Sequence, residues 1–360
     1  MQLVASKLKL FILLFLNATA NLIVKKLINS ARNLNCGHYF YFVKTLGLKK
    51  ETTNSIKHYW SIKDKICIYR TCGGYGDILM SRMIFEDFKK KYPHFHITYA
   101  VPQTYLEITK DHPYIDDVID LAKLDKNQYN SIFNITHNCL RYEVSTGKDC
   151  DKNRSDIWAE SFGLSLENHN MHLPNLDKNK DYIISQFKKH GYKEGQKIIL
   201  FTPYSAVPTR HLTSDHKQII ECLLARTNAF CFCLHSTVVL DQPKMPFIIG
   251  KNLIEAMSYV YFSDLVISTD TGHLHCAGGY DKPTLGFFNY TNGLMVGKHY
   301  KNLTVVQKTK ENDSDWNCGP CNDIGKCPYP VINHTLKCSR ELPDKIVESK
   351  AIDFLNKFCV

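Results

Sequence analysis

The stretch Ile66–Phe88, ICIYRTCGGYGDILMSRMIFEDF, decides the fold of this chain. Its first residues, Ile66–Tyr69, are apolar and predict a short buried strand, which runs into the glycine-rich turn Gly73–Asp77. Apolar residues then recur on one face of a single helix as far as Phe88, and three lysines in its last turn suit the helix dipole. A strand, a turn and a helix in this order are typical of a parallel α/β sheet.

Strand-like and helix-like patterns alternate along the rest of the chain. Residues 141–180 are polar and rich in Asn, Asp and Lys, and we place a domain junction there. We predict two Rossmann-like α/β domains, residues 61–180 and residues 181–345, and a closing amphipathic helix at 346–360. The other predicted strands are Ile97–Val101, Val118–Leu121, Ile132–Ile135, Ile198–Phe201, Phe230–Leu234, Leu265–Ser268 and Thr284–Phe288, and the predicted helices are Tyr182–Lys189, His216–Leu224, Leu253–Phe262 and Asp344–Phe358.

The composition is that of an ordinary globular protein of two domains. The 360 residues are 44% hydrophobic and 22% charged, which argues against wholesale disorder and against a polytopic membrane protein. The formal net charge of +10 suits an anionic partner such as a nucleotide, a phosphorylated glycan or an acidic membrane face.

Residues 1–60 form an N-terminal extension that allows two interpretations. The apolar run Leu10–Leu16 is followed by Ala18–Ala20, which has the small-x-small form of a signal-peptidase site. The apolar pattern resumes at Leu22–Val24 and ends in two lysines. We therefore expect an amphipathic helix on a core or on a membrane surface, with a cleaved secretory signal as the alternative.

The first of three chemically suggestive loops is Gly73–Asp77, directly after the first strand. Its glycines, Gly73, Gly74 and Gly76, let backbone approach a ligand closely, and the following helix N-terminus offers N–H groups to an anion. Taken alone, the loop is equally well explained as a tight turn with Asp77 in a favourable first-turn position. The glycine spacing is not that of the dinucleotide-binding fingerprint.

The other two loops follow strands of the second half. Residues Thr202–Arg210 carry several hydroxyl groups and end in an arginine, which suits a diphosphate. In Asp270–His275 (DTGHLH), either of the first two residues can cap the next helix, and Gly272 leaves backbone amides uncovered for a phosphate. His275 lies about one turn further on and can add a donor. A solvated loop and a plain helix cap are the alternatives.

Together the three loops resemble the motifs of glycosyltransferase family 9, the ADP-heptose:lipopolysaccharide heptosyltransferases. The family opens with a strand, a Gly-Asp turn and a helix, as Ile66–Phe88 does here, and its P-x-K loop is matched by Pro208–Arg210. Its hallmark, Asp-Thr/Ser-Gly-x-x-His followed by small residues and Lys-Pro, is matched within Asp270–Pro283. The resemblance covers residues 62–345 and implies the GT-B fold, in which two Rossmann-like domains face a cleft.

The resemblance also implies a role for each matched residue. Asp77 corresponds to the general base that deprotonates the acceptor hydroxyl, and its glycine loop lies on the acceptor side. Arg210 corresponds to a phosphate-binding lysine. The implied donor-binding residues are Ser205, Thr209, Arg210, Asp270, Thr271, Gly272 and His275. Two positions depart from the family: His211-Leu212 replaces a basic-aromatic pair, and His235–Thr237 stands where an acidic ribose ligand is expected.

The implied function is an inverting, metal-independent glycosyltransferase that moves a sugar from a nucleotide-diphosphate donor to a lipopolysaccharide or other surface-glycan acceptor. The resemblance favours heptose and ADP-heptose, a cytoplasmic location with peripheral contact to the inner membrane, and no nucleic acid partner. One carboxylate beside a phosphate site also suits single displacement with inversion on chemical grounds. The alternatives are a protein O-heptosyltransferase of the autotransporter type and a non-catalytic sugar-nucleotide-binding protein.

A fourth motif lies in the Cys-rich loop 316–340. Its pattern is Cys-x2-Cys-x5-Cys-x10-Cys amid Gly and Pro, which suits a structural, tetrahedral zinc or iron site. Autotransporter heptosyltransferases resemble it in carrying an iron-bearing cysteine motif there, with different spacing. Thiols that only pack a loop are the alternative. The four residues are Cys318, Cys321, Cys327 and Cys338.

Overall fold

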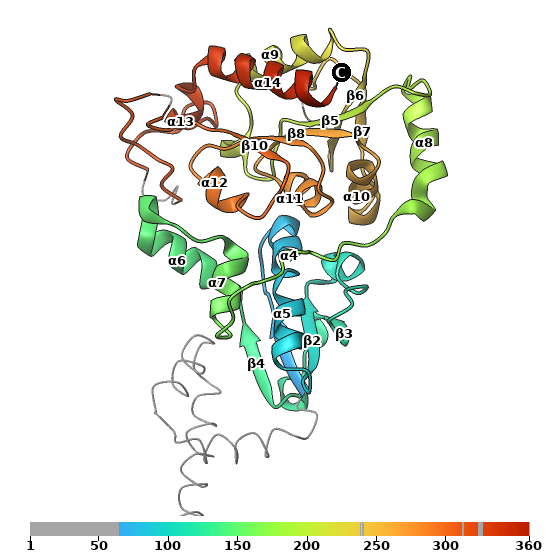
Figure 1. The fold of residues 1–360 in the computed structure, drawn as a ribbon, viewed down its shortest axis with the longest axis vertical. Helices are drawn as coiled ribbons and strands as arrows, with labels where there is room; N and C mark the ends of the chain where they lie inside the picture. The colour runs from blue at the N-terminus through green and yellow to red at the C-terminus, as the bar shows by residue number, and fades with distance from the viewer. Residues whose placement is uncertain (1–64, 238, 240, 312, 323–326, 360) are drawn as a thin grey trace, which may run out of the picture.

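The structure, a computed structural model, describes residues 65–359 except 238, 240, 312 and 323–326. The expected N-terminal extension at 1–60, with its amphipathic helix, lies outside the described residues. Figure 1 shows two α/β domains, one above the other, and each is built on a parallel sheet. The predicted two-domain α/β architecture is therefore confirmed. Within the described ranges, no helix is both long enough and apolar enough to cross a membrane.

The N-terminal domain is a four-stranded parallel sheet of order β3-β2-β1-β4. The central strand β1 is the apolar run that opens the sequence argument, and Ile66 and Ile68 are fully buried in it. The elements are β1 (Lys65–Tyr69), α4 (Tyr75–Ser81), α5 (Ile84–Lys91), β2 (His96–Val101), η1 (Gln103–Ile108), β3 (Asp117–Asp120), η2 (Leu121–Lys123), η3 (Lys126–Gln128), β4 (Ser131–Asn134), α6 (Asn138–Thr146), η4 (Gly147–Asp149) and α7 (Arg154–Glu160).

The single helix predicted after Asp77 is wrong, because the chain forms two helices, α4 and α5, with a turn between them. The amides of Arg82 and Met83 bond to carbonyls three residues back, at 3.1 and 3.2 Å, which is 3₁₀ rather than α-helical bonding. The hydroxyl of Ser81 donates to the Ile78 carbonyl at 2.8 Å. Such local side-chain bonds compete with a regular helix.

The C-terminal domain is a six-stranded parallel sheet of order β10-β9-β8-β5-β6-β7. Strands β7 and β10 were not predicted, because β7 has three residues and β10 is a mostly half-exposed edge strand. The elements are η5 (Asp177–Asn179), α8 (Lys180–Lys189), β5 (Ile198–Thr202), η6 (Pro208–Arg210), α9 (Ser214–Leu224), β6 (Phe230–His235), β7 (Phe247–Ile249), α10 (Leu253–Tyr261), β8 (Leu265–Thr269), α11 (Gly272–Gly279), β9 (Thr284–Phe287), α12 (Gly293–Val296), β10 (Leu303–Val306), α13 (Lys337–Arg340) and α14 (Asp344–Phe358).

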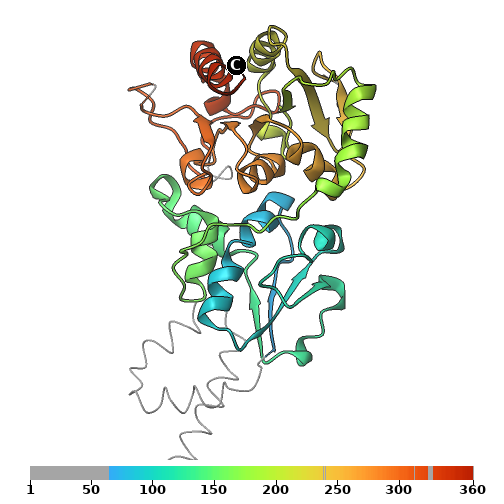
Figure 2. The ribbon, with the colours of Figure 1, turned by 45° about the vertical axis from the view of Figure 1, so that its right-hand side comes forward.

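The domains meet at the ends of two helices that follow central strands. Helix α4 follows β1 in the N-terminal domain, and helix α11 follows β8 in the C-terminal domain. Figures 1 and 2 both show α4 at the top of the lower domain, next to α11 of the upper domain. The carboxyl ends of both sheets thus face the same interface, which is where ligands bind in open α/β sheets.

Candidate active site

Helices α4 and α11 approach each other through glycines. A Cβ on Gly76 would lie 2.4 Å from Cδ2 of His275, and a Cβ on Gly272 would lie 2.0 Å from Cε1 of Tyr75. Gly73, with φ of +116°, turns the chain from β1 into α4, which a side chain would strain. Both glycine loops therefore form the contact between the domains, and the Tyr75 ring lies against Gly272.

Asp77, the predicted general base, lies in the first turn of α4 between two arginines. Its Oδ1 is 2.6 Å from Nη1 of Arg154, and its Oδ2 is 3.6 Å from Nη2 of Arg70. Burial would raise the pKa of Asp77, but the two guanidinium groups outweigh burial and hold the pKa below its ordinary value. Asp77 is therefore ionised at neutral pH and able to accept a proton.

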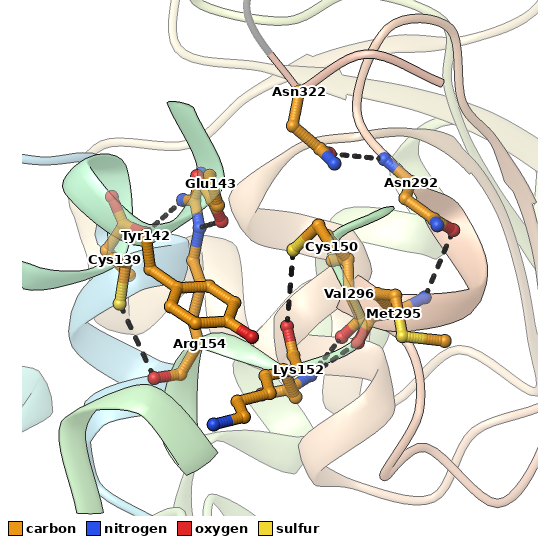
Figure 3. A network of polar contacts seen from close by, with 12 residues as sticks. Cys139, Tyr142, Glu143, Cys150, Lys152, Arg154, Asn292, Met295, Val296 and Asn322 are labelled. Atoms are coloured by element: carbon orange, nitrogen blue, oxygen red, sulfur yellow. Dashed lines mark hydrogen bonds and ion pairs between the residues drawn. The ribbon is translucent and has the colours of Figure 1, made fainter. Parts of the chain in front are cut away.

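Arg154 is itself held by Glu143, a residue of α6. Its Nε and Nη2 donate to the two carboxylate oxygens of Glu143 at 2.6 and 2.9 Å, so the pair is bidentate (Figure 3). Burial lowers the pKa of Arg154, but the carboxylates of Asp77 and Glu143 raise it by more. Sequence reasoning missed these two residues and Arg70. Arg70 lies directly after β1, close to Asp77 in the sequence, so it was the easiest of the three to predict as a site residue. No local sequence pattern connects Arg154 or Glu143 to Asp77.

On the other side of the interface, Arg210 pairs with Asp270. Nη1 of Arg210 is 3.3 Å from Oδ2 of Asp270, and Nε donates to the hydroxyl of Tyr290 at 3.0 Å. Nε2 of His275 is 3.7 Å from the other Asp270 oxygen. Burial would raise the pKa of Asp270, but Arg210 and His275 lower it well below its ordinary value. The structure therefore brings together three of the predicted donor-binding residues.

The remaining predicted donor-binding residues surround this pair. The hydroxyl of Ser205 donates to the Asp270 carbonyl at 3.4 Å, and Thr271 caps α11 by accepting from the His273 amide at 3.2 Å. Thr209 Oγ1 is buried and has no hydrogen-bond partner among the described residues. His211 is one of the departures from the family pattern. Its Nε2 lies 2.8 Å from the Ser205 carbonyl oxygen, and this contact helps to fix the loop Thr202–Arg210.

The two halves of the site form one cluster of charges. The charge of His275 lowers the pKa of Asp77, and the charge of Arg154 lowers the pKa of Asp270. The hydroxyl of Tyr300, a further residue that the sequence did not reveal, lies 2.7 Å from Nδ1 of His275. Because groups from both domains influence one another, the predicted base and the predicted donor site belong to a single site.

Comparison with known proteins shows which proteins this chain is similar to. No protein-family model matches the chain. A curated Escherichia coli (strain K12) protein, provisionally named lipopolysaccharide heptosyltransferase 4, is 25% identical over an alignment of 199 residues, and the match covers 51% of this chain. The chain spans about half the length of that relative, 51%.

Solved structures share the fold over most of the chain. A family 9 glycosyl transferase from Veillonella parvula DSM 2008 superposes with a TM-score of 0.61 and 15% identity, covering 83% of this chain and 98% of its own. The chain resembles the family 9 glycosyltransferases. The iron-containing dodecameric glycosyltransferase TibC from enterotoxigenic E. coli H10407 also superposes with a TM-score of 0.61, at 11% identity, covering 83% of this chain and 76% of TibC. The predicted GT-B-type, heptosyltransferase-like fold is thus confirmed.

The four cysteines of the Cys-rich loop lie close enough to influence one another. Burial, and to a smaller extent the neighbouring thiols of Cys318, Cys321 and Cys327, together raise the pKa of Cys338 to about 12. Within the described ranges, the ligand atoms that lie within 4.8 Å of one another belong instead to Asp156, His169 and His299. The four thiols therefore converge, but they do not form a closed ligand sphere in this arrangement.

Proposed function

We propose that the chain is an inverting glycosyltransferase that moves a heptose from ADP-heptose to a lipopolysaccharide or other surface-glycan acceptor. The proposal depends on one observation, the charged cluster that joins Asp77 of one domain to Arg210, Asp270 and His275 of the other. The curated relative's name supports the reaction and the acceptor class. A structure of TibC with ADP-D-β-D-heptose, with a TM-score of 0.61 to this chain, supports the donor.

In the proposed reaction Asp77 takes the proton of the acceptor hydroxyl. The acceptor oxygen forms a bond to the anomeric carbon while the bond from that carbon to the diphosphate oxygen breaks, and the diphosphate leaves with the electron pair. A single displacement of this kind inverts the configuration. Arg154 keeps the Asp77 carboxylate ionised and in one orientation, because it binds Asp77 and Glu143 together.

Arg210 stabilises the negative charge that develops on the leaving diphosphate. A guanidinium group matches the geometry of phosphate oxygens, and the N-terminus of α11 adds backbone N–H groups. In the present arrangement Arg210 pairs with Asp270, so the arriving diphosphate would share or replace that partner. The protein's own positive charge serves the leaving group in this proposal, so no catalytic metal is needed.

A donor panel tests this proposal. Thermal unfolding of the full chain is followed with ADP-heptose and with UDP- and GDP-sugars, because a ligand of the folded state raises the Tm. We expect ADP-heptose to raise the Tm most and the Arg210→Ala variant to lose that shift. The control variant Arg226→Ala, at an exposed position in the turn after α9, should keep it. ADP release on addition of a glycan acceptor completes the test. A chain that binds ADP-heptose but never releases ADP would instead be a sugar-nucleotide-binding protein.

A protein acceptor is the second candidate. It is favoured by the convergent cysteines at 318–338, because the resemblance to autotransporter heptosyltransferases lies in that loop. Both acceptor classes can be offered to the same enzyme preparation with ADP-heptose. A mass increase of one heptose on a protein, with none on lipopolysaccharide, would establish protein modification.

We also propose that Cys318, Cys321, Cys327 and Cys338 hold a structural zinc or iron ion. The four thiols influence one another's protonation, and the name of TibC, an iron-containing glycosyltransferase, supports a metal in a protein of this fold. Cys321→Ser should lose about one metal ion per chain by elemental analysis, whereas Cys222→Ser, exposed on α9, should not. Protein purified without chelator that contains no such metal would refute the proposal.

A further inference from the structure

Asp156, His169 and His299 come together where both domains meet the segment that joins them. Asp156 lies in the first turn of α7, His169 lies between α7 and α8, and His299 follows α12. Their ligand atoms all lie within 4.8 Å of one another. The proposed sugar transfer uses none of the three.

The three side chains are in direct contact with one another. Nε2 of His299 is 2.9 Å from Oδ1 of Asp156, and the His169 and His299 rings stack with centroids 3.7 Å apart and planes 21° from parallel. Imidazole nitrogens and carboxylate oxygens are groups that bind divalent metals.

Hydrogen bonds from a side chain of one domain to the backbone of the other hold the two domains together at this point. The side-chain amide of Asn153, the N-cap of α7, donates to the carbonyls of Met295 and Val296 at 2.8 and 2.7 Å. Figure 3 shows Met295 and Val296 of α12 beside the segment that leads into α7. Asp156 and His299 are therefore brought together by contacts that do not involve their own side chains.

A polar cavity of about 520 Å³ adjoins the group. His169 and His299 line it together with Glu167, Asn170 and Lys301. An ion with three protein ligands keeps a further position for water or another oxygen ligand, and the cavity provides room for one.

Among the described residues, Lys298 is a lysine that lies beside the Asp156 carboxylate. Its Nζ is 3.6 Å from Oδ2 of Asp156, and its side chain is 47% exposed, so it can turn into solvent when an ion binds.

We propose that Asp156, His169 and His299 form a binding site for a divalent cation of the zinc type that joins the two domains. Two imidazole nitrogens and one carboxylate oxygen are the ligands of open zinc sites and of facial-triad iron sites. Tetrahedral zinc places its ligand atoms about 3.3 Å apart, which is close to the spacing of this group, whose ligand atoms lie within 4.8 Å of one another. His299 precedes Tyr300, whose hydroxyl contacts His275, so the ion would also steady the donor side of the candidate active site.

The test uses the full chain, stripped with chelator and titrated with ZnCl₂ by calorimetry and with CoCl₂ by absorbance. We expect a nitrogen- and oxygen-ligated cobalt site, without thiolate charge-transfer bands, in addition to any site of the Cys-rich loop. His169→Gln and Asp156→Asn should each weaken zinc binding to this site by about tenfold or more and lose its share of the zinc-induced rise in Tm.

The matched control is His190→Gln, exposed at the end of α8, which should bind zinc as the parent does. Circular dichroism without metal shows whether each variant is folded, and the parent's cobalt spectrum gives the ligand types without any substitution. The proposal is overturned if folded His169→Gln and Asp156→Asn bind zinc as the parent does, or if all bound cobalt shows thiolate bands.

Discussion

Asp77 and Asp270 follow central strands of the two sheets and face one interface, and each pairs with an arginine, yet the two pairs differ. Arg154 lies 2.6 Å from Asp77 and is also held by both carboxylate oxygens of Glu143. Arg210 lies 3.3 Å from Asp270 and has no second carboxylate among its described contacts. The N-terminal pair is thus the tighter and more constrained of the two.

The difference matches what each half of the site must do. A general base has to stay in one place and one charge state, and two acidic partners fix the arginine that orients it. A leaving-group site has to accept a diphosphate that comes and goes. Arg210, held by one carboxylate and by the Tyr290 hydroxyl and ring, can exchange its partner more readily. The comparison therefore predicts separate effects on turnover, stability and donor affinity.

The largest effect is expected for Asp77→Asn, which keeps the size of the side chain but cannot take the acceptor proton. Turnover should fall about 10²–10⁴-fold, the usual contribution of a general base, while donor affinity stays nearly unchanged. The measurements are kcat for ADP release with acceptor present and the donor Kd by calorimetry. Asp353→Asn, exposed on α14, is the control. Near-normal turnover in Asp77→Asn would remove this residue from the mechanism.

Arg154→Ala should have the largest effect on stability. It leaves Asp77 and Glu143 buried without their shared cation, and breaking a buried pair costs about 3–5 kcal/mol of unfolding free energy. Urea denaturation measures the loss, and the exposed Arg226→Ala should stay within about 0.5 kcal/mol of the parent. A small loss in Arg154→Ala would show that the tight pair contributes geometry without stability.

Arg210→Ala should act on donor binding more than on folding. Loss of a charge-assisted hydrogen bond to phosphate should weaken ADP-heptose affinity by about 1.5–3 kcal/mol, measured by calorimetry. Arg210→Lys should recover part of the loss, because the charge returns without the planar fork. Unchanged affinity in Arg210→Ala would place the donor site elsewhere and erase the contrast between the two pairs.

Gly76→Ala tests the close approach of the two domains. Its Cβ would meet the His275 ring at 2.4 Å, so the interface must shift, at a cost of about 1–3 kcal/mol. Gly74→Ala is the matched control, because a Cβ there meets nothing within 4 Å, and its effect should stay within about 0.5 kcal/mol. Equal stabilities of the two variants would indicate that α4 and α11 are not in firm contact.

The smallest expected effect is on the pH dependence of unfolding, which distinguishes the Arg154→Ala variant from the parent. The folded-state pKa values of Asp77 and Asp270 are lowered from 3.8. The Asp77–Arg154 and Asp270–Arg210 pairs therefore contribute their full stabilisation above that pH, and this stabilisation is lost as the pH falls below it. In Arg154→Ala, the remaining burial raises the pKa of Asp77, and the loss between pH 5 and pH 3 should be smaller than in the parent. Denaturant titrations at those pH values provide the comparison. An identical loss would argue against the Asp77 pairing.

The sequence by itself determined the alternating α/β plan and placed candidate site residues after strands of both sheets. Each predicted strand has its counterpart, and Arg210, Asp270 and His275 could be named because they follow strands whose carboxyl ends share one sheet edge. Hydrophobic periodicity and turn residues are local signals, so they remain readable in a single chain. The break between α4 and α5 was beyond them, because it depends on bonding around Arg82 rather than on apolar spacing.

Only the tertiary structure decided what surrounds Asp77 and what joins the domains. Arg154 lies 77 positions from Asp77 along the chain, and His299 lies 143 positions from Asp156. No local pattern marks such partners, because packing within the N-terminal domain brings α6 and α7 to Asp77, and packing between the domains brings the segment after α12 to α7. A charged residue in a polar stretch looks the same whether it meets solvent or a buried carboxylate. Only the fold determines whether such a residue faces solvent or pairs with a buried carboxylate, because an unpaired buried charge costs folding free energy.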